Sequence, residues 1–213
     1  MDKAALTQEF NIQLETLLKK GYPEKSRLTK EEFVELVEPL RLVVEKLNVS
    51  NIDLENGYLP FVIVIRNQLV SSETAMSLVD KGGKNGITKL FPHQPNDFQI
   101  IPEENIPNKN VYLLIGIDRG KESINLPPAE ALTTIRKNGH HPLTIDEGIA
   151  IVTHYPEFLI RNNCFSLLAS RHIGDQRVPA IWINANKNPN LGWCWDGNPH
   201  TWLGSASAQD RIG

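Results

Sequence analysis

Apolar residues in the first 50 positions recur every three or four residues, the spacing of helices with one buried face. The first such stripe consists of Leu6, Phe10, Leu14, Leu17 and Leu18. A second stripe follows Thr29 and Glu32, whose spacing fits a capping box at a helix start. Pro39 lies inside this second segment and predicts a kink or a break. The pattern therefore predicts a helix, a turn and a second, interrupted helix.

From residue 58 onwards, continuous apolar runs replace the helical spacing. Phe61–Ile65 is an unbroken run rich in β-branched residues, which predicts a strand buried on both faces and central in its sheet. Further strands are predicted at 111–117, 164–170, 178–185 and 191–196, and helices at 72–79, 128–137 and 145–154. Ser72 is the expected cap of the first of these helices, and Thr144 with Glu147 forms a second capping box.

These elements predict an α+β fold, in which an N-terminal helical hairpin packs on a mixed or antiparallel sheet with further short helices. We expect residues 1–213 to form a single α+β domain, with a helical subdomain at 1–50 as the alternative. Residues 111–207 should form one cooperative unit with the strand at 61–65, because that strand offers no polar face.

Composition places the chain in the soluble globular class, with 40% hydrophobic and 22% charged residues. A net charge of −3 gives no reason to expect a nucleic-acid or membrane partner. The longest apolar run, Leu59–Ile65, is too short to cross a bilayer. Cys164 and Cys194 are expected to be reduced and unpaired in a cytoplasmic protein, because a chain of this length needs no disulfide to fold.

The segment Lys81–Gly86 has the glycines and lysines of a phosphate-binding loop. Such a loop requires Ser or Thr directly after its lysine and a helix behind it. Neither follows Lys84, so a flexible surface loop is the better interpretation.

All four tryptophans lie after residue 181, and three of them fall within Leu191–Gly204. If 191–196 is extended, Trp193 and Trp195 share one face, while Cys194 and Asp196 share the other. Buried tryptophans would hold a sheet against helices, whereas exposed ones would bind a small flat ligand such as a sugar or a base. The candidate ligand-binding residues are Trp193, Trp195, Asp196, Asn198, His200 and Trp202.

The same segment offers catalytic candidates. Cys194 could act as a nucleophile with His200 as its base and Asp196 or Asn198 as the orienting group, which would make the protein a hydrolase or a transferase. Candidate metal ligands are His140, His141, His154, His172 and His200, but no metal-binding spacing is present. The sequence predicts no metal and no cofactor.

Several stretches resemble an uncharacterised bacterial family classed as a domain of unknown function. They are Tyr112–Gly120, Pro142–Gly148, Asn162–Phe165, Arg177–Trp182 and Leu191–Gly204, and the last is a GWCWDGNPHTWLG-type motif. The resemblance covers about residues 111–207 and implies a bacterial, cytosolic protein. It implies no activity, ligand or catalytic residue, and the N-terminal helices lie outside it.

Three function classes stay open. The first is a structural or ligand-binding role centred on the tryptophan segment, with a small molecule as partner. The second is an enzyme that uses Cys194 and His200. The third is a protein-interaction module that uses the N-terminal helices.

Overall fold

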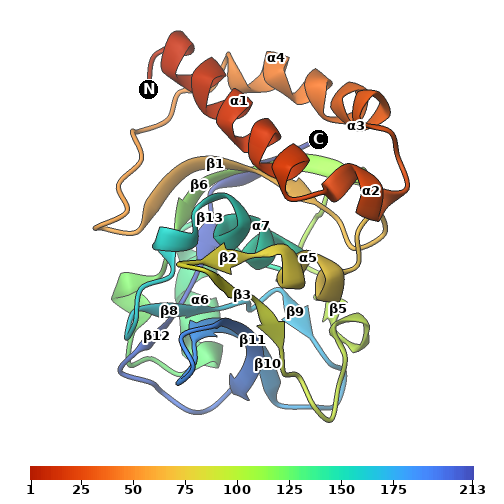
Figure 1. Ribbon diagram of the computed structural model, residues 1–213. Coiled ribbons are helices and arrows are strands. Elements are labelled where there is room, and N and C mark those ends of the chain that lie inside the picture. Colours follow the sequence, from red (N-terminus) through yellow and green to blue (C-terminus); the bar gives the residue numbers. More distant parts are fainter.

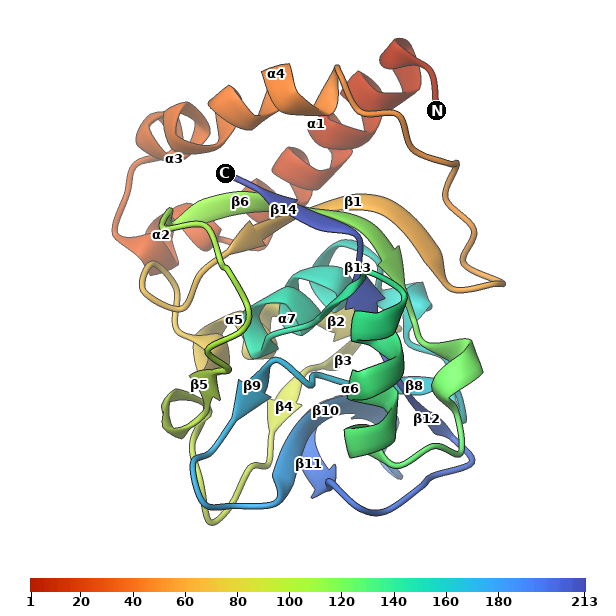
Figure 2. The ribbon, with the colours of Figure 1, turned by 180° about the vertical axis from the view of Figure 1, so that it is seen from behind.

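The computed structural model describes residues 1–213 and has an α+β fold (Figure 1). Figures 1 and 2 show the N-terminal helices above a first sheet, a central helix beneath that sheet, and a second sheet below the helix. No helix of the chain has the length and apolar character that crossing a membrane requires.

The N-terminal helices are α1 (Lys3–Lys19), α2 (Tyr22–Ser26), α3 (Lys30–Val37), the 3-10 turn η1 (Glu38–Leu40) and α4 (Arg41–Val44). The first helix, the start of the second at Thr29 and the break at Pro39 lie where the sequence predicts, whereas the short helix α2 in the predicted turn was not expected. The Thr29–Glu32 capping box is present, with the Thr29 hydroxyl accepting from the Glu32 N–H and the Glu32 carboxylate from the Thr29 N–H. The break predicted at Pro39 is the 3-10 turn η1, because proline cannot continue the helical hydrogen-bond ladder.

The first sheet has the strand order β1 (Tyr58–Ile65), β6 (Val111–Asp118), β13 (Ser207–Ala208), β7 (His141–Pro142), and β14 (Asp210–Ile212) also pairs with β6. All of its pairs are antiparallel. The C-terminus of the chain therefore lies beside a strand that is about 100 residues earlier in the sequence, which local patterns do not reveal.

The prediction that Phe61–Ile65 is central in its sheet is wrong, although the segment is buried on both faces. β1 is an edge strand that pairs only with β6. Its free edge is covered by Gln13 of α1, whose amide donates to the Phe61 carbonyl at 3.0 Å and accepts from the Ile63 N–H at 2.9 Å. A helix side chain thus provides the hydrogen bonds that a neighbouring strand would have made.

The central helix α7 (Ile145–His154) packs between the two sheets (Figures 1 and 2). Eight of its ten residues are buried, as expected of a helix covered on all sides. Gly148 permits this position, because a Cβ there would lie 2.4 Å from the Leu167 side chain. The predicted Thr144–Glu147 capping box starts the helix.

The second sheet is mixed, with the order β12 (Leu203–Ser205), β8 (Cys164–Ser166), β10 (Arg177–Ile183), β11 (Pro189–Trp195), β4 (Ile87–Thr88). β10 pairs antiparallel with β8 and β11, whereas β12 and β4 add parallel edges. Two short pairs complete the strands, β2 (Asp80–Lys81) with β3 (Lys84–Asn85) and β5 (Gln99–Ile100) with β9 (Ser170–Arg171). The remaining helices are α5 (Ser72–Leu78), α6 (Pro128–Lys137), η2 (Pro95–Asp97), η3 (Lys121–Ser123) and η4 (Pro156–Phe158).

Three local predictions need correction. The strand expected at 164–170 stops at Ser166, because the Ala169 backbone turns away to bond Leu143 and Ile101. Ser71, not Ser72, caps α5. The segment Lys81–Gly86 is a β2–β3 hairpin and not an irregular loop, with Gly82 and Gly83 both at positive φ in its turn.

Candidate functional site

The end of β11 carries two tryptophans on one face, as the strand alternation predicts. The rings of Trp193 and Trp195 meet edge to face with centroids 5.0 Å apart. Arg177 on β10 is the register partner of Trp195, and its guanidinium lies 4.6 Å and 4.8 Å from the two ring centroids. Since Trp195 is 40% exposed, these three side chains form a surface cluster and not a filled core.

This cluster is joined to two loops that are distant in sequence. The Trp193 Nε1–H donates to the Phe91 carbonyl at 2.9 Å, and Phe91 itself is 86% exposed. Two residues further on, His93 Nε2 lies 3.0 Å from Oδ2 of Asp175, which also pairs with the Arg177 guanidinium. Burial opposes ionisation of Asp175, but hydrogen bonds from His93 and Arg177 lower its pKa to about 2.

Cys194 occupies the opposite face of β11. Its Sγ lies 3.7 Å from the Ser166 hydroxyl, in the protein interior. Burial raises the pKa of the Cys194 thiol, which keeps it protonated and a poor nucleophile. No hydrogen bond joins Cys194 to His200, so the geometry does not assemble the Cys–His pair that an enzyme of this kind needs.

The rest of the tryptophan segment packs as an aromatic row. Trp202 meets Trp182 edge to face at 6.1 Å, and the His200 ring lies 5.3 Å from Trp202. Asp196 forms an ion pair with Arg171 at 2.9 Å. Asn198 is exposed directly after the Asp196–Gly197 turn.

The same segment supports the chain between Gly120 and Ala129. The Asn125 N–H donates to the His200 carbonyl at 2.9 Å, and the Ala129 N–H donates to the Asp196 carbonyl at 3.3 Å. A Cβ on Gly204 would lie 2.2 Å from the Gly120 carbonyl oxygen, so the two backbones touch. The tryptophan segment therefore fixes the position of the 120–129 loop.

Behind this loop lies an open cavity of about 640 Å³, bounded by α6 and by β12–β13. Only three of its 14 lining residues are hydrophobic, and these are Leu126, Ala131 and Ile135. The polar lining residues are Asn56, Asp118, Lys121, Glu122, Ser123, Thr134, Asn138, His140, Ser205 and Ser207, together with Gly120. The cavity thus has one apolar wall and is otherwise polar.

Several groups in this cavity are held in place by the fold. His140 Nδ1 lies 3.3 Å from the Ser207 hydroxyl. Oδ1 of Asp118 accepts from the Gly120 N–H at 2.6 Å. The fully buried Arg119 donates to the carbonyls of Leu54 and Glu55 at 3.2 Å, which anchors the loop that carries Asn56. Hydrogen bonds within the protein therefore hold the cavity walls in place.

Comparison with protein families gives one match, over residues 16–213. The chain belongs to the family of unknown function DUF5701. The DUF5701 match begins inside α1 and so includes the other N-terminal helices and β1, upstream of the stretches whose motifs carry the resemblance. No curated protein and no solved structure matches the chain.

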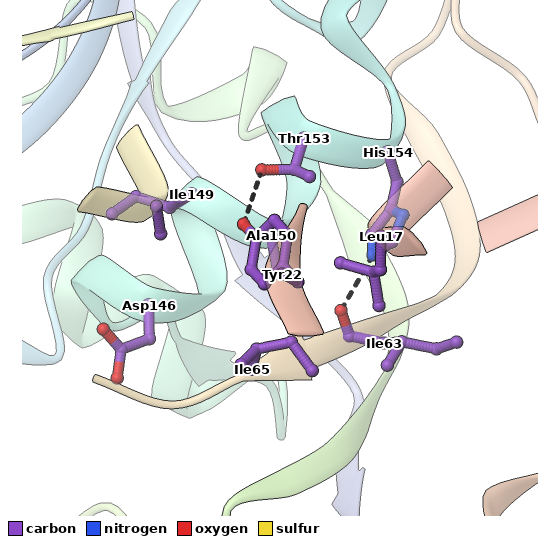
Figure 3. Close-up of a pocket in the computed structure, with 10 residues that line it drawn as sticks. Leu17, Tyr22, Ile63, Ile65, Asp146, Ile149, Ala150, Thr153 and His154 are labelled. Carbon is purple, nitrogen blue, oxygen red and sulfur yellow. Dashed lines mark hydrogen bonds between the residues drawn. The ribbon is translucent and has the colours of Figure 1, made fainter. Parts of the chain in front are cut away.

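A second enclosed space in the DUF5701 chain lies between α1, α2, β1 and α7 (Figure 3). Its volume is about 10 Å³, which is near the size of a single water and too small for a ligand. Figure 3 shows two contacts across it, Tyr22 to Thr153 at 3.4 Å and His154 to the Ile63 carbonyl at 2.9 Å. This space belongs to the core.

Sequence reasoning missed several residues that the fold brings together. His93, Asp175 and Arg177 were not candidates, because no spacing along the chain links residue 93 to residue 175. The cavity residues come from segments as distant as Asn56 and Ser207. The one available signal was the Ile117–Gly120 motif within the resemblance, which contributes Asp118 and Gly120 to the cavity lining.

Proposed function

We propose that this DUF5701 chain binds a small, hydroxyl-rich molecule in the 640 Å³ cavity beside α6. The cavity carries this proposal, because its volume lies in the range of small-molecule sites, roughly 300–1,000 Å³. Its walls come from α6, η3, β12–β13 and the Asn56 loop, and such convergence of separate segments is typical of binding sites.

The lining decides the class of ligand. The hydroxyl oxygens of Ser123 and Thr134 offer acceptors, because their protons are donated to backbone carbonyls, and the amides of Asn56 and Asn138 offer both donors and acceptors. Asp118 and Glu122 outnumber Lys121, which disfavours an anionic ligand. The apolar wall formed by Leu126, Ala131 and Ile135 suits one flat face of a sugar or a nucleoside. A neutral ligand of that size fits the lining best.

The test uses two neighbouring threonines of α6. Thr134 lines the cavity and Thr133 does not, and each hydroxyl bonds the carbonyl four residues earlier. Thr134→Arg should fill the cavity, whereas Thr133→Arg is a matched control on the same helix. Monosaccharides, nucleosides and polyols are screened by thermal shift, with fatty acids as a contrasting class. A ligand at 100 times its Kd stabilises the protein by about 2.7 kcal/mol.

A hydroxylated ligand that stabilises the wild type and Thr133→Arg, but not Thr134→Arg, supports the proposal. A screen with no hydroxylated hit, or hits retained in Thr134→Arg, overturns it.

A second binding surface is proposed at the tryptophan segment, because Trp195 and Phe91 are exposed beside the Arg177 guanidinium. A flat ligand would stack on Trp195, with the remaining candidate residues of the segment at its edge. Saturable quenching of tryptophan fluorescence by a ligand, lost in Trp195→Ala, would support this role. Quenching that Trp195→Ala leaves unchanged would contradict it.

The finer context of the protein is also proposed. The GWCWDGNPHTWLG-type motif supports a bacterial origin, and two unpaired buried cysteines suit a reducing cytoplasm.

One core runs from Phe10 of α1 through Phe61 of β1 to Ile181 of β10, which supports a single folding unit over residues 1–213. One cooperative transition followed by both circular dichroism and tryptophan fluorescence is the expected result. Two separate transitions would support an independent N-terminal subdomain.

A further inference from the structure

We infer that His93, His172 and Asp175 form a binding site for a divalent transition-metal ion such as Zn²⁺. One potential ligand atom from each residue lies within 4.8 Å of the other two. His93 follows β4, whereas His172 and Asp175 lie in the loop between β9 and β10. The site shares no residue with the cavity beside α6, so it goes beyond the ligand-binding function proposed above.

The donor set selects the kind of metal. Two imidazoles and one carboxylate suit zinc, iron(II), cobalt(II) or nickel(II), whereas Mg²⁺ and Ca²⁺ prefer oxygen ligands alone. Three protein ligands leave at least one coordination position for water or for a bound molecule. The arrangement is therefore that of an open metal site and not of a closed structural one.

One distance already fits coordination. His93 Nε2 and Asp175 Oδ2 are 3.0 Å apart, and two ligand atoms at this separation, each about 2.1 Å from a metal, subtend roughly 90° at it. Two atoms that share an ion at about 2.1 Å are at most about 4.2 Å apart, so the widest pair of the set, within 4.8 Å, closes slightly when the ion binds. The ion would take the place of the hydrogen bond between His93 and Asp175.

Aromatic and polar neighbours surround the ligands. The His93 and His172 rings stack at an interplanar angle of 26° with centroids 4.2 Å apart, so one ring must rotate for both in-plane lone pairs to reach one ion. Phe98 contacts both rings edge to face at 5.7 Å and 6.3 Å. Oδ1 of Asp175 accepts from the Arg177 N–H at 2.7 Å, which orients the carboxylate. Such outer contacts fix ligand geometry in known metal sites.

Two further observations bear on the site. His172 Nδ1 is buried and has no hydrogen-bond partner, and a ring nitrogen left in that state favours any group that satisfies it. The Arg177 guanidinium pairs with Asp175 and repels a cation there. It bonds Oδ2, the same carboxylate oxygen that faces His93, so an ion there would share this oxygen with the guanidinium. We therefore expect affinity below that of structural zinc sites.

The experiment titrates Zn²⁺ into the metal-free full chain by isothermal calorimetry. The wild type should bind one ion per chain, and His93→Asn and His172→Asn should each weaken binding at least tenfold. His141→Asn is the matched control, because the adjacent His140 and His141, at β7, are alternative zinc ligands elsewhere in the chain.

Circular dichroism and thermal melting of the metal-free variants establish that each is folded, and two independent histidine variants keep the test decisive if one fails to fold. Stoichiometric binding lost in His93→Asn or His172→Asn and kept in His141→Asn establishes the site. Absence of saturable binding to the wild type, equal affinity in these two variants, or loss in His141→Asn alone overturns it.

Discussion

The Arg211 guanidinium donates to both carboxylate oxygens of Glu147, which lies 64 residues earlier in the chain. Both side chains are almost fully buried, and the pair ties β14 to the start of α7. Burial alone would raise the pKa of Glu147, but the attraction of Arg211 and its hydrogen bonds lower it below its usual value. The same carboxylate accepts from Tyr112 at 2.8 Å and closes the Thr144 capping box, so one ionised group organises three elements.

Arg211→Leu should therefore destabilise the protein by about 3–5 kcal/mol, because it leaves the Glu147 charge buried without its partner. Urea unfolding at pH 7 measures the loss. Lys19→Leu is the control, since Lys19 pairs with Glu15 at the surface and such pairs contribute about 1 kcal/mol or less. Equal small losses in both variants would show that the buried pair does not stabilise the fold.

The second prediction concerns the covered edge of β1. Gln13→Leu should cost about 1–3 kcal/mol, because the Phe61 carbonyl and the Ile63 N–H lose their partner in the interior. Gln8→Leu, at an exposed position of the same helix, should change the free energy of unfolding by about 0.5 kcal/mol or less. Hydrogen exchange of the Ile63 amide should accelerate in Gln13→Leu alone. Unchanged exchange would indicate that the amide is protected by other means.

The third prediction is a dependence of stability on pH. Burial lowers the pKa of His154 from 6.5 to about 4, with Lys20 adding to the shift and the Ile63 carbonyl opposing it. Between about pH 6.5 and pH 4 the unfolded state therefore binds a proton on His154, whereas the folded state does not. The free energy of unfolding is highest above about pH 6.5 and falls as the pH drops towards 4. This difference between the unfolded and folded pKa values of His154 corresponds to roughly 3 kcal/mol in the free energy of unfolding.

Urea unfolding of the wild type at pH 7 and pH 5 should show about 2 kcal/mol of this loss, because pH 5 lies between the two pKa values. His154→Gln, which keeps a donor for Ile63, should lose much less between the two pH values, whereas His141→Gln should follow the wild type. The prediction fails if His154→Gln and the wild type show the same dependence.

Helices and their boundaries were predictable where residues close together in the sequence determine them. Both capping boxes, at Thr29 and Thr144, depend on residues three positions apart, and both are present. The break at Pro39 follows from the geometry of one residue. Sequence patterns within one turn or one strand contain this information.

Features that depend on contacts between distant parts of the chain could not be predicted from the sequence. The apolar run Phe61–Ile65 reports burial on both faces but does not tell whether a strand or Gln13 covers the edge. His93 and Asp175 are 82 residues apart, and only the packing of two loops brings them together. The alternation along β11 placed Trp193 and Trp195 on one face, yet Arg177 between them comes from the neighbouring strand.

The fourth prediction concerns the two cysteines, both of which are free and buried. Burial raises the pKa of both thiols, so the reactive thiolate is scarce and solvent access is poor. A thiol reagent should label neither residue rapidly in the native protein and both in denaturant, without prior reduction. Rapid native labelling of Cys194 would support the nucleophile hypothesis, and failure to label in denaturant would reveal a disulfide.

The last prediction separates packing from binding in the tryptophan segment. Asp196 pairs with Arg171 where both side chains are partly exposed, so Asp196→Asn should cost about 1 kcal/mol or less. Trp193→Ala should cost more, towards the lower end of the roughly 3–5 kcal/mol typical of buried tryptophans, because its ring is half-buried and its Nε1–H bonds Phe91. His200→Ala removes a contact with Trp202 but leaves the backbone bond to Asn125, so its cost should fall between the two. Urea unfolding of the three variants gives the order.

If Asp196→Asn and His200→Ala both unfold the protein, the segment is a buried hydrogen-bonded corner, and ligand binding by its polar residues is excluded. If both are stable, loss of ligand-induced fluorescence quenching in these variants tests binding directly, since the fold that presents Trp195 is then intact.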